Sequence, residues 1–365
     1  MSTPTTTRDV PLLDYIDQID GPWLEAALAG NFPGARIEGF SAHPVGAGNV
    51  SDTVAVELTY AERPEGAPDS VVVKFRPSDP DVHAHGLGSG AYHREIGAYR
   101  TVQTPNCRLP RLVHVAGDET NINLVVEDLT SATPGDQVAG CSVEAAHAVL
   151  AELAGLHATF PMDPETAPDW TIKLPEVADY WTEKMQAGAA IIEERFAEDL
   201  SPDDFAAIRD GAALVRDWHH LAPRLQTLTH GDPRVDNVLF EEVDAKPRAV
   251  LIDWQVTGVR NPMYDVGYFL SGSIDIEDRR THEDDLLQRY VDRYNAISET
   301  PYDLADARAD FRVQVLSGLI ITTAAIAVLP DNEVVNRLIL ALIRRNCAAV
   351  TDWGSIAAAR AAIAG

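Results

Sequence analysis

The sequence predicts an α+β protein with two lobes, a small half made mostly of antiparallel strands followed by a larger half made mostly of helices. The chain has 365 residues, more than one compact core usually holds. Short runs rich in β-branched residues fill the first third, whereas patterns with helical periodicity fill most of the remainder. We expect the boundary near Glu127–Leu129, which divides the chain into lobes of residues 1–127 and 128–365.

The small half is predicted to contain a helix, three antiparallel strands, a second helix and two more strands. The first helix is "GPWLEAALAG", and the second, "GAYHREIGAYRTVQT", places Tyr92, Ile96 and Tyr99 on one face. The strands, bounded by clusters of turn-forming residues, are "RIEGFSAHPVG", "DTVAVELTYA", "SVVVKFRP", "PRLVHVAG" and "NINLVVEDL". The glycine cluster "GLGSG", residues 86–90, is expected to be a mobile connector before the second helix.

The large half is predicted to be helical apart from one short strand. "SVEAAHAVLAELAGLHATF" has an amphipathic pattern, with Ser142 or Asp136 as its N-cap. A helix pair follows between about residues 180 and 220, with a turn at Ser201–Pro202. "RAVLIDW" is the short strand, and the uncharged stretch Val313–Pro330 is predicted to be a buried helix because it is short for a membrane span.

The composition is that of an ordinary globular protein, but the charge is unusual. Hydrophobic residues make up 45% and charged residues 23%, which is not the signature of a disordered chain, and the formal net charge is −27. Nucleic acids and anionic membranes need a basic surface, so we expect neither as a partner. The charge is compatible with a cationic or neutral substrate, and solubility alone is the simpler explanation.

The cysteines and the start of the chain indicate a cytoplasmic protein. Cys107, Cys141 and Cys347 are odd in number and far apart, without C-x-x-C spacing, so neither a disulfide framework nor a zinc site is expected. The opening "MSTPTTTRDVPLLDY" lacks the basic and apolar regions of a signal peptide. No oligomeric state follows from these features.

The densest group of polar residues is "LTHGDPRVDNVLF", residues 228–240, which sets His230, Asp232 and Asn237 between apolar residues. Asp253 follows at the end of the predicted strand. Mg²⁺ prefers oxygen ligands from one or two side chains together with substrate phosphates, which Asn237 and Asp253 can supply while Asp232 faces a hydroxyl. The alternative is a capped loop in which these side chains bond local backbone amides.

The pattern H-x-D-x-x-x-x-N followed by an aspartate at a strand end resembles the catalytic and metal loops of protein-kinase-like phosphotransferases, which include aminoglycoside, choline and ecdysteroid kinases. "HGDPRVDNVLF", "DWQ", "LVVEDL" and "LAGLHA" are most similar to the ecdysteroid-kinase-like branch, over roughly residues 36–270. The resemblance implies a bilobal protein-kinase-like fold. It also implies a kinase that transfers a phosphoryl group from ATP or GTP, with Mg²⁺, to a small-molecule hydroxyl.

Phosphoryl transfer requires a lysine on the third strand and a helix glutamate that pairs with it. "VVVKF" supplies Lys74 inside an apolar strand, where a lone lysine is costly, and "YHREIGAY" supplies Glu95. A solvated edge lysine is the alternative. Gly46 and Gly48 lie between the first two strands and allow backbone amides to approach phosphates, with Ser51 where a third glycine of the usual loop stands.

The resemblance also implies roles for residues around these loops. His230 holds the catalytic loop by hydrogen bonds, and Asp265 braces the same loop. The adenine edge bonds backbone groups of the linker from Glu127 to Leu129. The other histidines, at 83, 85, 219 and 220, are interpreted as ordinary surface or core residues, because neither pair has an obvious third metal ligand.

The acceptor is expected to bind against the helical region of about residues 176–222. Its apolar side chains can line a pocket for a steroid- or terpenoid-like alcohol, although packing between the helices is the preferred interpretation for most of them. They are Tyr180, Trp181, Met185, Ile191, Ile192 and Phe196. Three alternatives stay open: an aminoglycoside- or choline-type kinase, a silent nucleotide-binding pseudokinase, and a metal-dependent hydrolase using His230, Asp232 and Asp253.

Overall fold

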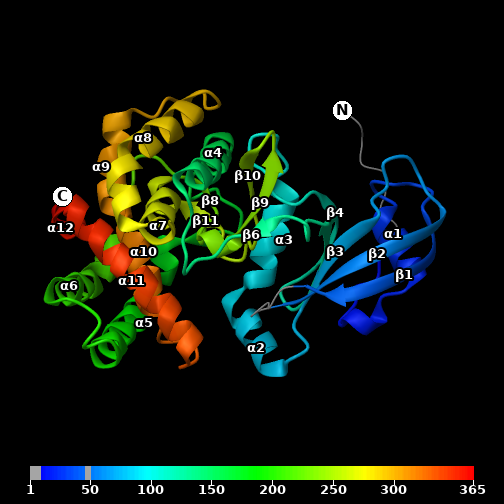
Figure 1. Ribbon diagram of the computed structural model, residues 1–365, viewed down its shortest axis with the longest axis horizontal. Helices are drawn as coiled ribbons and strands as arrows, with labels where there is room; N and C mark the ends of the chain where they lie inside the picture. The colour runs from blue at the N-terminus through cyan, green and yellow to red at the C-terminus, as the bar shows by residue number, and fades with distance from the viewer. Residues whose placement is uncertain (1–9, 46–50) are drawn as a thin grey trace. The chain divides into compact units, whose positions relative to one another are not determined.

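The computed structural model describes residues 10–45 and 51–365, which form two compact units. Unit 1 consists of the described residues up to Gln103, of Leu109–Thr133 and of the short piece Asp253–Gln255. Unit 2 consists of Thr104–Arg108, Pro134–Ile252 and Val256–Gly365. The first unit is built on a sheet and the second mostly on helices, so the predicted α+β organisation is confirmed (Figure 1).

Unit 1 contains a five-stranded sheet in the order β1-β2-β3-β5-β4, with every neighbouring pair antiparallel. Alternation along β3 buries Val71, Val73 and Phe75 completely and turns Lys74 to the opposite face. The five strands are those that the sequence predicts: β1 (Arg36–Pro44), β2 (Asp52–Glu62), β3 (Ser70–Phe75), β4 (Leu112–Gly117) and β5 (Ile122–Glu127).

Helix α1 (Gly21–Leu28) covers the face of this sheet opposite Lys74. It begins at Asp20, whose carboxylate accepts a hydrogen bond from the Trp23 N–H. The helix buries Trp23 and Leu24 against the apolar side chains of β2 and β3, and a short 3₁₀ turn, η1 (Ile16–Gln18), precedes it. This core fixes the strand that carries Lys74.

The prediction that residues 86–90 form a mobile connector is wrong, because all but the last of them belong to a helix. Helix α2 (Pro80–Ser89) begins with Asp79, whose side chain accepts from the Asp81 and Val82 N–H groups, and Pro80 suits the first turn. Only Gly90 leaves the helix, with φ of 69°, and α3 (Ala91–Thr101) follows it directly. The N-cap and proline outweigh the low helix propensity of the glycines.

Unit 2 is built from nine helices within the described residues. Ser142 caps α4 as predicted, and Ser201, at the predicted turn, is the N-cap of α6. The expected helix over Val313–Pro330 is divided at Val315. None of the described helices is both long and apolar enough to cross a membrane. The helices are α4 (Val143–Thr159), α5 (Leu174–Arg195), α6 (Pro202–His219), α7 (Met263–Ser273), α8 (Ile276–Asn295), α9 (Leu304–Gln314), α10 (Leu316–Ala325), α11 (Glu333–Trp353) and α12 (Ser355–Ala364).

Two small sheets carry the loops of the sequence motif. One has the order β10-β9-β6 and the other β7-β11-β8. Sequence analysis expects only the strand of β10, and misses β9, which pairs with it through a tight turn at Asp244–Ala245 with positive φ at both positions. The strands are β6 (Thr133–Pro134), β7 (Ile172–Lys173), β8 (Thr227–Thr229), β9 (Val238–Val243), β10 (Lys246–Leu251) and β11 (Gly258–Arg260), and the 3₁₀ turn η2 (Val235–Asn237) leads into β9.

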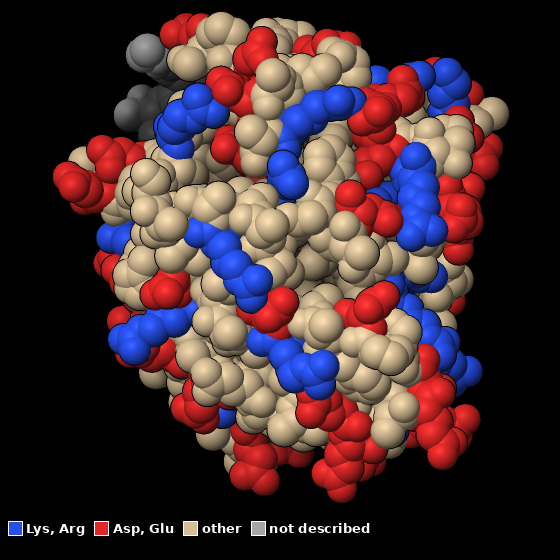
Figure 2. Space-filling view, turned by 90° about the vertical axis from the view of Figure 1, so that its left-hand side faces the viewer, with Lys and Arg blue, Asp and Glu red and all other residues tan. Residues whose placement is uncertain are grey.

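Charged side chains on the face shown in Figure 2 are of both signs. Red acidic side chains gather along its lower edge, and blue basic ones are scattered among acidic ones elsewhere. Many exposed arginines pair with carboxylates, as in Arg216–Asp179, Arg224–Asp306 and Arg360–Asp210. Such pairs contribute at most about 1 kcal/mol each. On this face the acidic side chains therefore gather at the lower edge and stand among basic ones elsewhere.

Candidate active site

His230 joins the motif loop to the end of β10. The loop leaves β8 at Thr229, and Gly231 takes a positive φ of 89°. The imidazole Nε2 lies 2.9 Å from the Ile252 carbonyl oxygen, and the Asp232 N–H donates to Nδ1 at 3.3 Å. These contacts match the loop-holding role expected for His230. They also fix the residue that immediately precedes Asp253.

Asp265, on α7, accepts hydrogen bonds from the same loop. Its carboxylate accepts from the backbone N–H groups of His230 at 2.6 Å and Gly231 at 2.9 Å, and the His157 Nε2 lies 3.1 Å away. Burial alone would raise the Asp265 pKa, but the hydrogen bond and charge of His157 help to bring this pKa below its ordinary value. Asp265 is therefore a charged residue that holds the loop at His230 and Gly231, and both of its carboxylate oxygens have partners inside unit 2.

Asp232 and Asn237 lie together, and Asn237 orients Asp232. The Asn237 Nδ2 donates to the Asp232 carbonyl at 2.9 Å and to its carboxylate Oδ2 at 3.0 Å, while Arg234 Nε lies 3.4 Å from the same Oδ2. Oδ1 of Asp232 is buried and has no hydrogen-bond partner among the described residues. Burial and the Asp232 carboxylate raise the pKa of the nearby Tyr268 hydroxyl well above its ordinary value. One carboxylate oxygen is thus held, while the other has no hydrogen-bond partner among the described residues.

Lys74, Glu95 and Asp253 lie together in unit 1. The lysine Nζ is 2.7 Å from Glu95 Oε1 and 3.6 Å from Asp253 Oδ1. Burial opposes the charge on Lys74, yet the two carboxylates outweigh it and raise the lysine pKa above its ordinary value. The alternative of a solvated edge lysine is therefore wrong, because β3 is an inner strand and Lys74 is an ion-paired residue with a side chain only 14% exposed.

Asp253 has an unusual backbone for a non-glycine residue, with φ of 64°. Its side chain is 40% exposed, while Oδ1 is buried without a hydrogen-bond partner among the described residues. Backbone strain of this kind costs roughly 1–3 kcal/mol and is found at functional sites. An unsatisfied carboxylate oxygen on a strained residue suits a hard cation, and no described group donates to the amide oxygen of Asn237.

The two residues expected as metal ligands belong to different units, Asn237 to unit 2 and Asp253 to unit 1. Among residues 10–45 and 51–365, no group of three or more His, Cys, Asp or Glu side chains is arranged to hold a metal ion. Mg²⁺ takes few protein ligands and several phosphate and water oxygens, and the amide oxygen of Asn237 and the carboxylate of Asp253 are each of the ligand type that it prefers.

Gln255 is a site residue that sequence analysis misses. Its Nε2 donates to Glu95 Oε2 at 3.3 Å, and its backbone carbonyl accepts a hydrogen bond from Arg94 Nε. Glu95 therefore meets Lys74 through one oxygen and Gln255 through the other. The motif "DWQ" contains this residue, but the sequence gives no sign that a glutamine two residues after Asp253 contacts α3.

In unit 2, sequence analysis misses His157 and Gln137. His157 lies within "LAGLHA", is fully buried, and contacts the Tyr290 hydroxyl at 2.7 Å as well as Asp265. Gln137 accepts from the Val235 N–H at 2.8 Å and donates to the Gly272 carbonyl at 2.9 Å. A polar residue on an apolar helix face was the available signal for His157. No comparable signal marks Gln137, which lies outside regular structure.

The residues expected around the nucleotide are only partly described. Gly46 and Gly48 lie outside the described residues, and Ser51 is buried at the start of β2. Glu127 ends β5, and its carboxylate accepts from the Arg111 N–H. Leu129 is buried, and its N–H makes no hydrogen bond within the described chain, so this donor can bond an adenine edge.

The aromatic and aliphatic residues of α5 mostly pack the helices, as preferred from the sequence. Met185, Ile192 and Phe196 are buried in the core of unit 2, and Trp181 and Ile191 pack against it. Tyr180 is the exception: it is 47% exposed, and its ring lies edge-on to Trp181 with 5.3 Å between the ring centroids. Only this end of α5 offers an accessible aromatic surface.

Three of the four histidines interpreted as ordinary residues, His83, His219 and His220, bond neighbouring groups. His219 is buried and contacts the Val215 carbonyl, and burial lowers its pKa to about 4. His220 contacts the Arg216 carbonyl one turn away, and His83 contacts Arg76 and the Thr120 carbonyl. The side chain of His85 lies outside the described part of the structure.

Three solved structures with similar folds are small-molecule kinases. A microcompartment-associated aminopropanol kinase aligns with a TM-score of 0.52 at 15% identity, covering 84% of this chain and 90% of that one. Plasmodium vivax ethanolamine kinase aligns with 0.50 at 10% identity, covering 85% and 82%. The GDP complex of aminoglycoside 2′-phosphotransferase-IIIa aligns with 0.51 at 15% identity, covering 90% and 99%. These identities show the fold alone, and the predicted bilobal protein-kinase-like fold is confirmed.

The sequence comparisons agree with the fold. The curated proteins give no match to this chain. The family model described as the ecdysteroid kinase-like family matches residues 46–299, which is well over half of the 365 residues. This chain belongs to the ecdysteroid kinase-like family.

Proposed function

We propose that this protein is a nucleotide-dependent O-phosphotransferase that phosphorylates a hydroxyl group of a small molecule. The observation that carries the proposal is the cluster in unit 1, in which Lys74 Nζ lies 2.7 Å from Glu95 and 3.6 Å from Asp253. A buried lysine between two carboxylates is the arrangement that phosphoryl transfer uses to hold a nucleotide's phosphates beside a metal. Family membership supports the same reaction.

Each polar group has a role in this proposal. Lys74, held by Glu95, binds the α- and β-phosphates, and Asp253 with Asn237 holds Mg²⁺. When bound, the ion neutralises charge on the β- and γ-phosphates. The lobe of residues 1–127 binds the nucleotide, and the lobe of residues 128–365 binds the acceptor. Positioning and charge neutralisation supply most of the acceleration.

Asp232 receives the proton of the acceptor hydroxyl. Its Oδ2 is held by Asn237 and Arg234, whereas Oδ1 is buried and has no hydrogen-bond partner among the described residues. A hydroxyl that donates to Oδ1 is oriented for attack on the γ-phosphate and loses its proton to the same oxygen. His230 and Asp265 keep this loop in place through the contacts with Ile252 and the two backbone N–H groups.

We propose ATP as the phosphoryl donor, with GTP to be tested beside it. The linker from Glu127 to Leu129 receives the adenine edge, and the Leu129 N–H, which has no described partner, supports this placement. GTP enters the test because one solved structure with a similar fold is a GDP complex.

For the acceptor we propose an apolar alcohol of the steroid or terpenoid class. The accessible Tyr180–Trp181 surface at one end of α5 supports it, as does the family's description. The solved structures with similar folds include an aminopropanol kinase and an ethanolamine kinase. Amine-bearing alcohols therefore belong in the same screen as the sterols.

The first experiment is thermal unfolding of the wild type and of Asp253→Ala, with ATP or GTP, each with and without Mg²⁺. A ligand at a hundredfold excess over its dissociation constant stabilises the folded protein by about 2.7 kcal/mol, which raises Tm by a few degrees. We expect a magnesium-dependent rise in the wild type and none in the variant. A folded wild type that responds to neither nucleotide would refute the proposal.

Turnover then separates an active kinase from a pseudokinase. The protein, Mg²⁺ and the preferred nucleotide are incubated with hydroxylated steroids, terpenoid alcohols, amino alcohols and aminoglycosides, and nucleoside diphosphate release is measured. We expect release with one class above the rate without acceptor. Asp232→Asn keeps nucleotide binding and abolishes that release. Binding without release for every class would favour the pseudokinase.

A further inference from the structure

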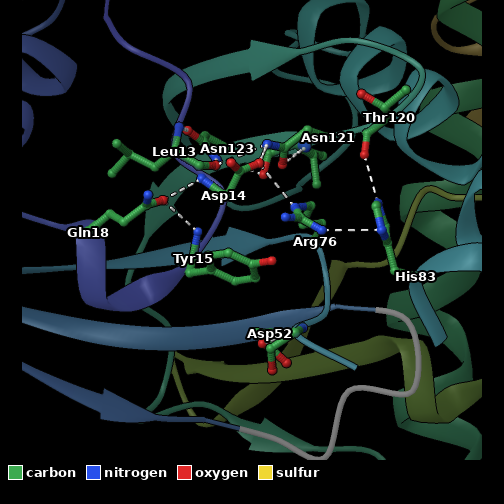
Figure 3. Close-up of polar contacts among 12 residues, drawn as sticks. Leu13, Asp14, Tyr15, Gln18, Asp52, Arg76, His83, Thr120, Asn121 and Asn123 are labelled. Carbon is green, nitrogen blue, oxygen red and sulfur yellow. Dashed lines mark hydrogen bonds and ion pairs between the residues drawn. The ribbon is translucent and has the colours of Figure 1, made fainter. Parts of the chain in front are cut away.

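Arg76 lies two residues after Lys74 and holds a second positive charge at the end of β3. Figure 3 shows it between the N-terminal segment, which carries Asp14 and Tyr15, and His83 of α2. Two residues of strand span roughly 6.6 Å, longer than one phosphate group but within the reach of a polyphosphate chain. The side chain of Arg76 is only 16% exposed, so most of it is already out of water.

The Arg76 guanidinium is held on three sides. Nε donates to Asp14 Oδ1 at 3.2 Å, Nη1 lies 3.2 Å from His83 Nδ1, and the Tyr15 ring lies 4.5 Å from the guanidinium carbon. Because arginine only donates, His83 accepts at Nδ1, and its Nε2 contacts the Thr120 carbonyl at 2.8 Å. Nη2 has no hydrogen-bond partner in the described chain. The group is thus fixed in place while the N–H groups of Nη2 are unused.

Anchoring of the N-terminal segment does not require Arg76. Asn123 accepts from the Leu13 N–H at 2.7 Å and donates to the Leu13 carbonyl at 2.8 Å. Asn121 donates to Asp14 Oδ1 at 3.0 Å, the same oxygen that Arg76 contacts. The segment is therefore held by the side-chain amides of Asn123, on β5, and of Asn121, just before β5 (Figure 3). Holding this segment alone does not account for the fixed position of Arg76.

Tyr92 supplies a neutral donor beside His83, the histidine that contacts Arg76. It lies one turn before Glu95 on α3, and its buried hydroxyl has no hydrogen-bond partner among the described residues. Its ring centroid lies 6.0 Å from that of His83. Burial raises the Tyr92 pKa, and the charges of Lys74 and Arg76 oppose this. Leaving a buried donor unsatisfied is unfavourable, and a phosphate oxygen would satisfy it.

We propose that Arg76 and the Tyr92 hydroxyl form a second phosphate-binding group beside Lys74. This second group contacts the terminal phosphate of the nucleotide. The inference rests on the proposed function, because it needs a nucleotide at Lys74. Lys74 binds the inner phosphates, and the fixed guanidinium with its free Nη2 binds the outer one. Arginine suits this task because its planar donors match phosphate oxygens. The N-terminal segment is then the support that sets the position of Arg76.

Calorimetric titration of the wild type, Arg76→Gln, Arg76→Lys and Tyr92→Phe with ATP, ADP and AMP, all with Mg²⁺, tests the inference. We expect Arg76→Gln to weaken ATP binding about tenfold or more, since a charge-assisted hydrogen bond contributes about 1.5–3 kcal/mol. AMP affinity stays within about twofold. Arg76→Lys recovers part of the loss, and Tyr92→Phe, which keeps the ring, weakens ATP a few-fold.

Arg63→Gln is the matched control, because Arg63 also lies over a tyrosine ring, that of Tyr60, and pairs with an aspartate, Asp69. It should bind all three nucleotides as the wild type does. Equal ATP affinity of Arg76→Gln and the wild type would overturn the inference and leave the proposed function intact. An equal loss for ATP and AMP would show a structural role instead. A wild type that binds no nucleotide would refute both proposals.

Discussion

Two buried carboxylates, Asp265 in unit 2 and Glu95 in unit 1, have pKa values that are shifted in opposite directions by their partners, although burial raises the pKa of both. At Asp265, two backbone N–H groups and His157 surround the carboxylate, and its pKa falls below the ordinary value. At Glu95, burial raises the pKa, Lys74 opposes this, and the nearby Asp253 carboxylate raises it further. Unit 2 thus satisfies its charge internally. Unit 1 places two carboxylates against one lysine and keeps a surplus of negative charge.

Because of this difference, we expect the Asp265 cluster to contribute to the stability of the fold and the Lys74 cluster to contribute to ligand binding. The Asp265 cluster needs no further partner, so its hydrogen bonds stabilise the folded chain. The Lys74 cluster has an unsatisfied Asp253 oxygen and a strained backbone at the same residue. A bound cation would relieve the charge surplus there. Substitutions in the two clusters should therefore fail in different assays.

The largest expected effect is on stability. Asp265→Ala leaves two backbone N–H groups and His157 without their acceptor in a buried site, and we expect the unfolding free energy to fall by about 3–5 kcal/mol. Urea denaturation followed by tryptophan fluorescence measures the change. The control is Asp306→Ala, which removes an exposed partner of Arg224 and should change stability by at most about 1 kcal/mol. Equal losses in the two variants would contradict the brace role.

The next effect is on turnover. Asp253→Asn keeps a residue type that tolerates positive φ but removes the charge, so we expect kcat to fall roughly a thousandfold. Unfolding free energy should stay within about 1 kcal/mol of the wild type. Nucleoside diphosphate release, with the acceptor found in the screen, gives kcat. Asp244→Asn is the matched control, because Asp244 also has positive φ but lies in the β9–β10 turn. An Asp253→Asn enzyme with a tenth of the wild-type rate would contradict the assignment.

Sequence patterns predicted the parts of these clusters that depend on residues close together in the sequence. Alternation in β3 placed Lys74 on the face opposite the buried valines, the Ser142 cap marked the start of α4, and the turn at Ser201–Pro202 marked the start of α6. The spacing of the motif "HGDPRVDN" identified the loop that His230 and Asp265 hold. In contrast, α2 was missed because glycines lower helix propensity, although Asp79 and Pro80 begin the helix.

Contacts made far along the chain had no sequence signal. Gln255 meets Glu95 across 160 positions and His157 meets Asp265 across 108. Nothing in the local pattern around either residue specifies its partner. A polar side chain in an apolar stretch predicts that a partner exists, but only the fold shows which one. The roles given to the site residues remain predictions for the experiments described.

The dependence of stability on pH sharpens the contrast at Asp265. Because folding lowers the Asp265 pKa, the stabilisation it provides is fully present above its unfolded pKa of about 3.9. It is lost as pH falls from there through the folded pKa. We expect the stability difference between the wild type and Asp265→Asn to be constant near neutral pH and to narrow below about pH 4. Urea denaturation at several pH values measures it. A difference that does not narrow would contradict the lowered pKa.

Two buried glutamines, one in each unit, provide the smallest and most direct comparison. Gln255→Leu removes the hydrogen bond to Glu95 Oε2, and we expect the KM for ATP to rise about two- to tenfold with little change in Tm, because the bond orients a ligand-binding pair. Gln137→Leu removes the bonds to Val235 and Gly272, and should lower the unfolding free energy by about 1–3 kcal/mol while the KM for ATP stays within about twofold. Steady-state kinetics and urea denaturation of both variants give the four values. If Gln255→Leu lost stability and Gln137→Leu lost ATP affinity, unit 1 could not be the unit that is completed by its ligand.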